Sequence, residues 1–298
     1  MRLSLPRLCA LLWLGLSPAP ATAAGWPENY VVAEDSTSPN GQYAVLIPTA
    51  DADDQWETNY LVDLKEKKLL GKIRGAGYFE RSPRLGLAVL WADDSTWCAV
   101  EYDERWGFSG LSILEPTKHG FTQTEIGERI TKACDAAMAK EQRHPTGGYA
   151  NLYENVTADR QVKVNALSFT NPKGLDDKSF YALFRGSYDL KSKKWTSAVA
   201  RALSQDDFDS LKLAFEYDAG DALESLKTIE READQASHLD ELLNQMYQAL
   251  RILLPADRFV TLKQEQIAWL KTRDAEQSAP TKLKLIAARI DALSKLLP

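Results

Sequence analysis

The chain has 298 residues, a length that permits one or two ordinary domains. Lysine and arginine number 36 and aspartate and glutamate number 42, so the formal net charge is −6. This charge excludes nucleic acids and anionic lipid surfaces as partners drawn by electrostatics, and it favours either a cationic partner or simple solubility.

Residues 1–23 have the pattern of a secretory signal peptide. Arg2 and Arg7 precede a short apolar run, Leu8–Leu16, and Ala21-Thr22-Ala23 has the small residues of a cleavage site. The run is too short for a stable membrane anchor, which is the alternative interpretation. We therefore expect a periplasmic or secreted protein cleaved near Ala23. Losing the two arginines leaves 34 basic against 42 acidic residues, a net charge of −8.

Residues 24–204 are predicted to form a β-rich domain. Ser38-Pro39-Asn40-Gly41 is a turn signal before an apolar strand, and "NYLVDLKEKKLLGKI" and "LGLAVLWADDSTWCAVEYD" each place a polar turn between two short strands. The region Ser38–Glu115 loosely resembles the strand-turn-strand units of β-propellers. A closed propeller needs at least four blades of about 40 residues, which this length barely permits.

A helix-prone segment, Glu128–Arg143, interrupts these strands with apolar residues at helical spacing. Two further strand segments follow, "DRQVKVNALSFTN" and "FYALFRGSYDLKSKKWTSAVARAL". We therefore expect a small, mainly antiparallel β domain with one or two inserted helices. Ser204, followed by acidic residues, is the expected N-cap of the next helix.

Cys98 and Cys134 are the cysteines that remain after signal cleavage. In an oxidising compartment such a pair is a candidate disulfide. The alternative is two small buried apolar side chains, and the sequence does not decide between them.

Residues 205–298 have helical periodicity. Apolar residues from Leu239 to Leu254 lie on one helical face, Pro255 breaks the run, and Ser278-Ala279-Pro280 breaks the next helix. Phe259, Leu262, Gln266, Trp269 and Arg273 share one stripe of that second helix, and Leu283, Ile286, Ile290, Leu293 and Leu297 share one stripe of the last. Short breaks between helices favour an antiparallel bundle. The expected fold class is thus α+β, a β domain followed by a helical bundle.

The ordered pattern Leu243-Asn244…Tyr247…Leu250, then Gln264…Trp269…Arg273-Asp274-Ala275-Glu276, resembles the helical domain of LprI-type lysozyme inhibitors. The resemblance covers roughly residues 236–298. It implies an exported helical module that binds lysozyme or another cationic cell-wall hydrolase. Such domains usually carry two cysteines that staple the helices, and here Ser237 and Gln277 lie near those positions. Apolar packing and the β domain must then compensate for the typical 2–4 kcal/mol of a disulfide.

The residues expected to contact a partner are Asn244, Tyr247, Trp269, Lys271, Arg273 and Asp274. Trp269 and Arg273 are four residues apart and face one side of a helix, so they form an aromatic–arginine patch of the kind found at binding hot spots. The alternative is that Trp269, Arg273 and Asp274 only fix helix packing.

No nucleophile–base motif or phosphate loop is present, and His119, His144 and His238 lack metal-ligand spacing, so neither an enzyme nor a cofactor is expected. "DADDQWE", residues 51–57, has the acids of a calcium loop but has Trp56 where glycine is required. Two functions remain. One is an exported inhibitor that occludes the cleft of a cell-wall hydrolase; the other is an envelope interaction protein whose β domain binds an unknown partner.

Overall fold

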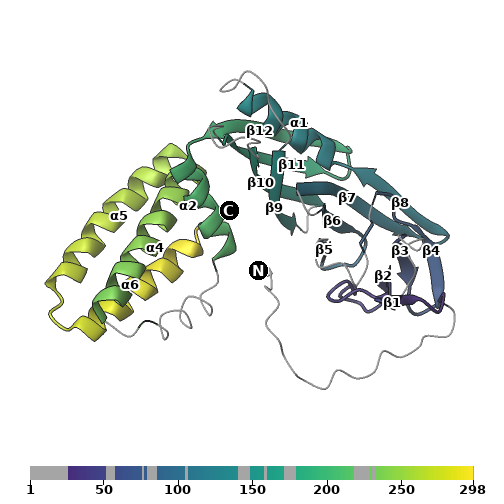
Figure 1. Ribbon diagram of the computed structural model, residues 1–298, viewed down its shortest axis with the longest axis horizontal. Helices are drawn as coiled ribbons and strands as arrows, with labels where there is room; N and C mark the ends of the chain where they lie inside the picture. The colour runs from purple at the N-terminus through teal and green to yellow at the C-terminus, as the bar shows by residue number, and fades with distance from the viewer. Residues whose placement is uncertain are drawn as a thin grey trace. The chain divides into compact units, whose positions relative to one another are not determined.

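The computed structural model describes residues 26–51, 58–75, 77–78, 86–104, 107–139, 148–157, 160–170, 179–217, 229 and 232–297. The described chain divides into a β unit and a helical unit, with the boundary between Ala202 and Leu203 (Figure 1). The expected signal peptide and residues 52–57 of the expected acidic loop lie outside the described residues. Among the described helices, none combines the length and apolar character needed to cross a membrane.

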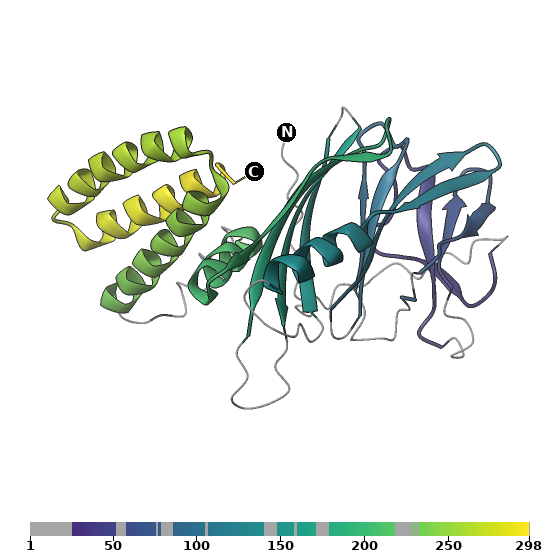
Figure 2. The ribbon, with the colours of Figure 1, turned by 90° about the horizontal axis from the view of Figure 1, so that it is seen from above.

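In the β unit, the described residues form three antiparallel sheets, each made of four strands that are neighbours in the sequence (Figures 1 and 2). The first sheet contains β1 Tyr30–Val32, β2 Tyr43–Pro48, β3 Tyr60–Asp63 and β4 Lys68–Lys72; the second contains β5 Gly86–Trp91, β6 Cys98–Glu104, β7 Gly107–Thr117 and β8 Gly120–Glu125; the third contains β9 Gly148–Thr157, β10 Gln161–Thr170, β11 Tyr181–Asp189 and β12 Lys194–Leu203. Strands followed by helices confirm the predicted α+β fold class.

The turn between the third and fourth strands is the same in the first and third sheets. Residues 63–68 and 189–194 share the sequence Asp-Leu-Lys-x-Lys-Lys. The Oδ1 atoms of Asp63 and Asp189 accept hydrogen bonds from the backbone N–H two residues later, at 3.0 and 2.8 Å. Lys67 and Lys193 both have positive φ, 50° and 53°. A side-chain-capped turn of this kind ends one strand and starts the next.

A second repeated turn joins the first two strands of the first and second sheets. Residues 33–37 and 92–96 share the sequence Ala-acid-Asp-Ser-Thr. In both, the serine N–H donates to the alanine carbonyl three residues earlier, at 3.3 Å for Ser36 and 2.8 Å for Ser95. Four-stranded meanders with recurring turns have the topology of propeller blades, although the described residues form three of them and a closed propeller has at least four.

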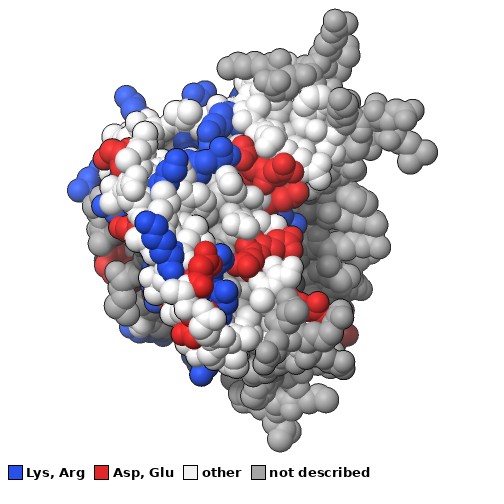
Figure 3. Space-filling view, turned by 90° about the vertical axis from the view of Figure 1, so that its left-hand side faces the viewer, with Lys and Arg blue, Asp and Glu red and all other residues white. Residues whose placement is uncertain are grey.

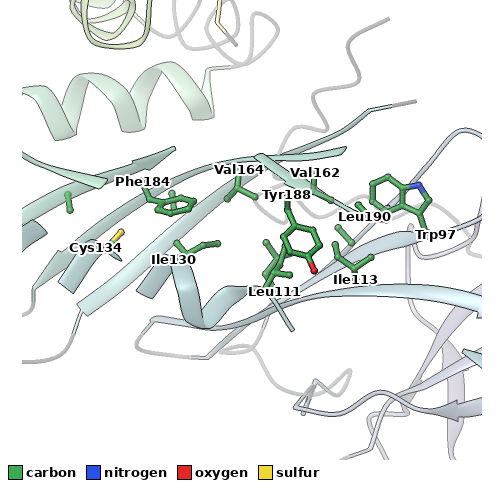
Figure 4. Close-up of a cluster of buried hydrophobic side chains, with 14 of the residues drawn as sticks. Trp97, Leu111, Ile113, Ile130, Cys134, Val162, Val164, Phe184, Tyr188 and Leu190 are labelled. Atoms are coloured by element: carbon green, nitrogen blue, oxygen red, sulfur yellow. The ribbon is translucent and has the colours of Figure 1, made fainter. Parts of the chain in front are cut away.

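Alternate residues of the second sheet face two different cores. Cys98, Val100 and Leu114 point toward the first sheet, where Val45 and Leu61 complete a buried cluster. The intervening residues point toward the third sheet and the helix α1, Gly127–Met138, which lies in the segment expected to be helical. Figure 4 shows this second cluster, with Leu111 beside Tyr188, Ile113 beside Leu190, and Phe184 beside Ile130 of α1. Side-chain alternation along the strands thus lets one sheet support two layers.

The candidate disulfide between Cys98 and Cys134 is not formed, and both cysteines are free and buried. Cys98 lies in the core between the first and second sheets, whereas Cys134, on α1, lies in the core between the second and third. Burial raises the pKa of both thiols, that of Cys134 to about 12. The second interpretation of the sequence, two small buried apolar side chains, describes their environment.

The helical unit contains α2 Gln205–Glu216, α4 Glu232–Leu253, α5 Ala256–Ala275 and α6 Ala279–Ser294. Ser204 caps α2 as predicted, since its Oγ accepts the backbone N–H of Asp207 at 3.2 Å. The buried apolar residues on α4 and α6 follow the predicted stripes: Leu239, Leu242, Leu243, Met246, Ala249, Leu250, Leu253, Ile286, Ile290 and Leu293. Helix α5 differs from its neighbours because only Leu262 and Gln266 of its 20 residues are buried.

Candidate functional site

Arg273 joins α5 to α4. Its Nη1 donates to Asp240 Oδ1 on α4 at 2.9 Å, and its Nε and Nη2 lie 2.9 Å from Asp274 Oδ1 on α5. The guanidinium also lies over the indole of Trp269, with its Cζ 5.6 Å from the ring centroid. We call these four residues, Asp240, Trp269, Arg273 and Asp274, the Arg273 junction. Two carboxylates and one guanidinium give it a net charge of −1.

The two carboxylates of the Arg273 junction are more exposed to solvent than its guanidinium. The Arg273 side chain is 19% exposed, against 47% for Asp240 and 60% for Asp274. Trp269 is half-buried. The geometry expected of Trp269 and Arg273, side by side on one helical face, is therefore present. The guanidinium already has two carboxylate partners, which is the arrangement of a residue that holds two helices together.

Tyr247 makes a second contact between α4 and α5. Its ring lies against that of Phe259, with the centroids 5.2 Å apart and the planes at 46°. Burial raises the pKa of Tyr247. Asn244, one turn earlier on α4, is exposed. Of the expected contact residues on α4, Asn244 is thus open to a partner, whereas Tyr247 is engaged in packing.

Lys271 lies on the side of α5 opposite to Trp269. At about 100° per residue it is about 200° around the helix from Trp269. Lys271 is exposed and has no ion-pair partner among the described residues. The six expected contact residues therefore do not form one continuous surface: Trp269 and Arg273 face inward, and Lys271 faces outward.

A polar contact between α5 and α6 was not anticipated. Gln266, 8% exposed, accepts a hydrogen bond through Oε1 from Nε of Arg289 at 2.9 Å. The signal for it was a glutamine in the middle of the apolar stripe of α5, since a buried amide needs a hydrogen-bond partner. Its partner on α6 could not be assigned from spacing within one helix.

The comparisons with known proteins bear on this unit. Residues 221–292 match the family model described as Lysozyme inhibitor LprI. The helices α4, α5 and α6 fit this family model. The resemblance seen in the sequence begins at about residue 236, and the family match begins earlier, at residue 221. The match includes α4, α5 and all of α6 except its last residues. No curated protein and no solved structure gives a significant match to the chain.

The positions at which the resemblance implies stapling cysteines carry other residues here. Position 237 is serine and position 277 is glutamine, so no disulfide can link these points. In the described structure, side-chain contacts join the helices instead: Arg273 to Asp240 between α4 and α5, and Arg289 to Gln266 between α6 and α5.

The described residues contain no group of three or more histidine, cysteine, aspartate or glutamate side chains placed to hold a metal ion. The helical unit instead presents a surface of mixed charge. Figure 3 shows acidic and basic side chains interspersed with uncharged surface where this unit faces the viewer.

Proposed function

We propose that this protein is an exported bacterial inhibitor of lysozyme or of a related cell-wall hydrolase, and that it binds through its LprI domain. The observation that carries the proposal is the match of residues 221–292 to the lysozyme-inhibitor family model. The signal-peptide pattern of residues 1–23 supports export, because it would bring the chain to the compartment where such hydrolases act.

Charge supports the proposed class of partner. The net charge of −8 expected after signal cleavage attracts a cationic enzyme and accelerates its encounter with the inhibitor. The exposed carboxylates of Asp240 and Asp274 and the exposed amide of Asn244 lie at or next to the Arg273 junction. We propose that this side of α4 and α5 contacts the hydrolase, and that Trp269, Tyr247 and Arg273 hold the two helices in place for it.

The proposed mechanism is occlusion of the substrate cleft. Glycoside hydrolases use a pair of carboxyl groups at the scissile bond, and an inserted cation would pair with them. Lys271 can supply this cation: it lies on the outward face of α5, three residues before the exposed Asp274, and has no ion-pair partner among the described residues. Arg273, in contrast, is already paired with two carboxylates.

The test is the lysis of bacterial cell walls by lysozyme with and without the purified mature chain. Inhibition should weaken with added salt, since exposed charges are screened. Lys271→Glu should weaken inhibition, whereas Lys284→Glu, at an exposed lysine of α6, should leave it unchanged. Unchanged lysis at a large excess of the wild-type chain would rule out the inhibitor function.

A second candidate is an envelope interaction protein in which the β unit binds the partner. The three four-stranded meanders of the described residues favour this function, because the surface loops that join the strands of such sheets commonly carry binding residues. A pull-down from periplasmic extract with the mature chain should then recover a protein that is not a muramidase. Recovery of a muramidase alone, together with inhibition in the lysis assay, would eliminate this candidate.

A further inference from the structure

The outward face of α5 carries two exposed aliphatic side chains. Val260 is 60% exposed and Ile267 is 42% exposed, and these are the large hydrophobic residues most exposed in the described helical unit. They are seven residues apart, so they lie about two turns apart on the same side of the helix. Because α5 buries only Leu262 and Gln266 inward, this outer stripe has no partner within the described chain.

Charged and polar residues extend the stripe symmetrically. Asp257 precedes Val260 by three residues, Lys271 follows Ile267 by four, and Gln264 lies in the middle. At 100° per residue, all five positions fall within an arc of about 80°. Asp257, Gln264 and Lys271 are exposed, and neither charged group has an ion-pair partner among the described residues.

This pattern is complementary to itself. The midpoint of Asp257 and Lys271 is residue 264, and the midpoint of Val260 and Ile267 lies half a residue from it. When two copies of α5 run antiparallel about a two-fold axis at Gln264, each Val260 meets the Ile267 of the other copy. Each Asp257 then meets the other Lys271. A two-fold interface requires such reciprocity, in which each contact is made twice.

We propose that the outward face of α5 is a homodimer interface, formed by antiparallel pairing of the two α5 helices. The occupant follows from charge complementarity: an acid and a base at opposite ends of the stripe match a second copy in reverse orientation. One helix pair is smaller than a standard protein interface, so the dimer is weak and depends on concentration. It also covers Lys271, so a hydrolase that needs this side chain would compete with the dimer.

The first test is sedimentation of the full mature chain over a concentration series. The wild type should show a reversible monomer–dimer equilibrium, and Val260→Glu should raise its Kd at least roughly tenfold, because both copies lose an apolar contact and gain a buried charge. The matched control is Val199→Glu, which changes a valine of similar exposure, 66%, on β12 and should leave the Kd unchanged. A wild-type chain that stays monomeric at every concentration overturns the proposal.

Charge reversal tests the pairing itself. Asp257→Lys and Lys271→Glu should each weaken self-association, because each places like charges opposite one another. Mixing these two variants should give a heterodimer, since the lysines of one then face the acids of the other. If the mixture is no more dimeric than either variant alone, the proposed register is wrong.

Crosslinking tests the orientation. Gln264→Cys lies on the proposed two-fold axis and should form an intermolecular disulfide under oxidation. Asp257→Cys should not, because the two copies of residue 257 would be about 21 Å apart along the helices. Crosslinking at residue 257 with none at 264 would contradict the antiparallel pairing. Cys98 and Cys134 are buried and do not compete. Val260→Glu should retain inhibition in the lysis assay, so loss of the dimer and loss of the proposed function are separate results.

Discussion

Replacing Arg273 by alanine distinguishes a packing role of the Arg273 junction from a direct role in binding. The variant loses the ion pair to Asp240, which is worth about 0.2–1 kcal/mol because the carboxylate is 47% exposed and screened by solvent. It also loses the stacking on Trp269, worth about 0.5–1 kcal/mol at a partly exposed site. We therefore expect a loss of about 1–2 kcal/mol in the free energy of unfolding.

The measurement is denaturant unfolding of the mature chain followed by far-UV circular dichroism. Lys263→Ala is the matched control, because Lys263 is an exposed base on the same helix without an ion pair in the described structure, and its loss should stay within about 0.5 kcal/mol. A double-mutant cycle with Asp240→Ala should give a coupling energy of about 0.2–1 kcal/mol. The packing role is refuted if Arg273→Ala is as stable as Lys263→Ala and yet fails to inhibit the hydrolase.

Four further outcomes follow from the contacts described. Phe184→Ala should destabilise the β unit by about 3–5 kcal/mol in denaturant unfolding, because Phe184 is fully buried between the sheets. Ser204→Ala should cost about 1 kcal/mol through loss of the α2 cap, whereas Ser204→Asp should restore most of it. Burial raises the pKa of Asp63, but its hydrogen bonds lower it more, so the net shift is downward. The ionised Asp63 therefore stabilises the fold above its unfolded pKa of about 4, and this stabilisation is lost as the pH falls through its lower folded pKa. In Asp63→Asn, the free energy of unfolding should consequently fall less steeply as the pH is lowered. Cys98 and Cys134 are free and buried, so they should react with a thiol reagent only after denaturant is added. If the two cysteines formed a disulfide, no thiol would react even in denaturant.

Local signals predicted the helical unit well. The apolar stripe from Leu239 onward, the break at Pro255 and the cap at Ser204 depend on residues within one or two turns of each other, and each has the expected place in the structure. The 200° between Trp269 and Lys271 is also fixed by helix geometry alone. Helical spacing was therefore sufficient to show that the expected contact residues do not share one face.

The β unit was harder because its decisive contacts are remote in sequence. Strand runs and turns were recognisable, and the Asp-Leu-Lys-x-Lys-Lys repeat at 63–68 and 189–194 was a readable sign of recurring units. However, strand alternation does not tell which neighbour each face of the second sheet meets. Cys98 and Cys134 illustrate this: both are buried, yet the sheet between their clusters was not visible from spacing.

The polar contacts of α5 determine which of its faces is exposed. A helix with only two buried residues has little apolar packing to fix its rotation about its own axis. Arg273–Asp240 and Gln266–Arg289 leave the same inward stripe of α5 toward two different helices, α4 and α6. Both contacts are directional, so they specify that rotation where hydrophobic contact alone would not. A rotation of about half a turn would expose Trp269 and bury Lys271 and the stripe of Val260 and Ile267. The double variant Arg273→Ala with Arg289→Ala lacks both polar contacts. In this variant a quencher should reach the Trp269 side chain more easily and reduce its fluorescence more, and dimerisation should be weaker. If quenching rises while the dimer is unaffected, the rotation of α5 is not what sets its outward face.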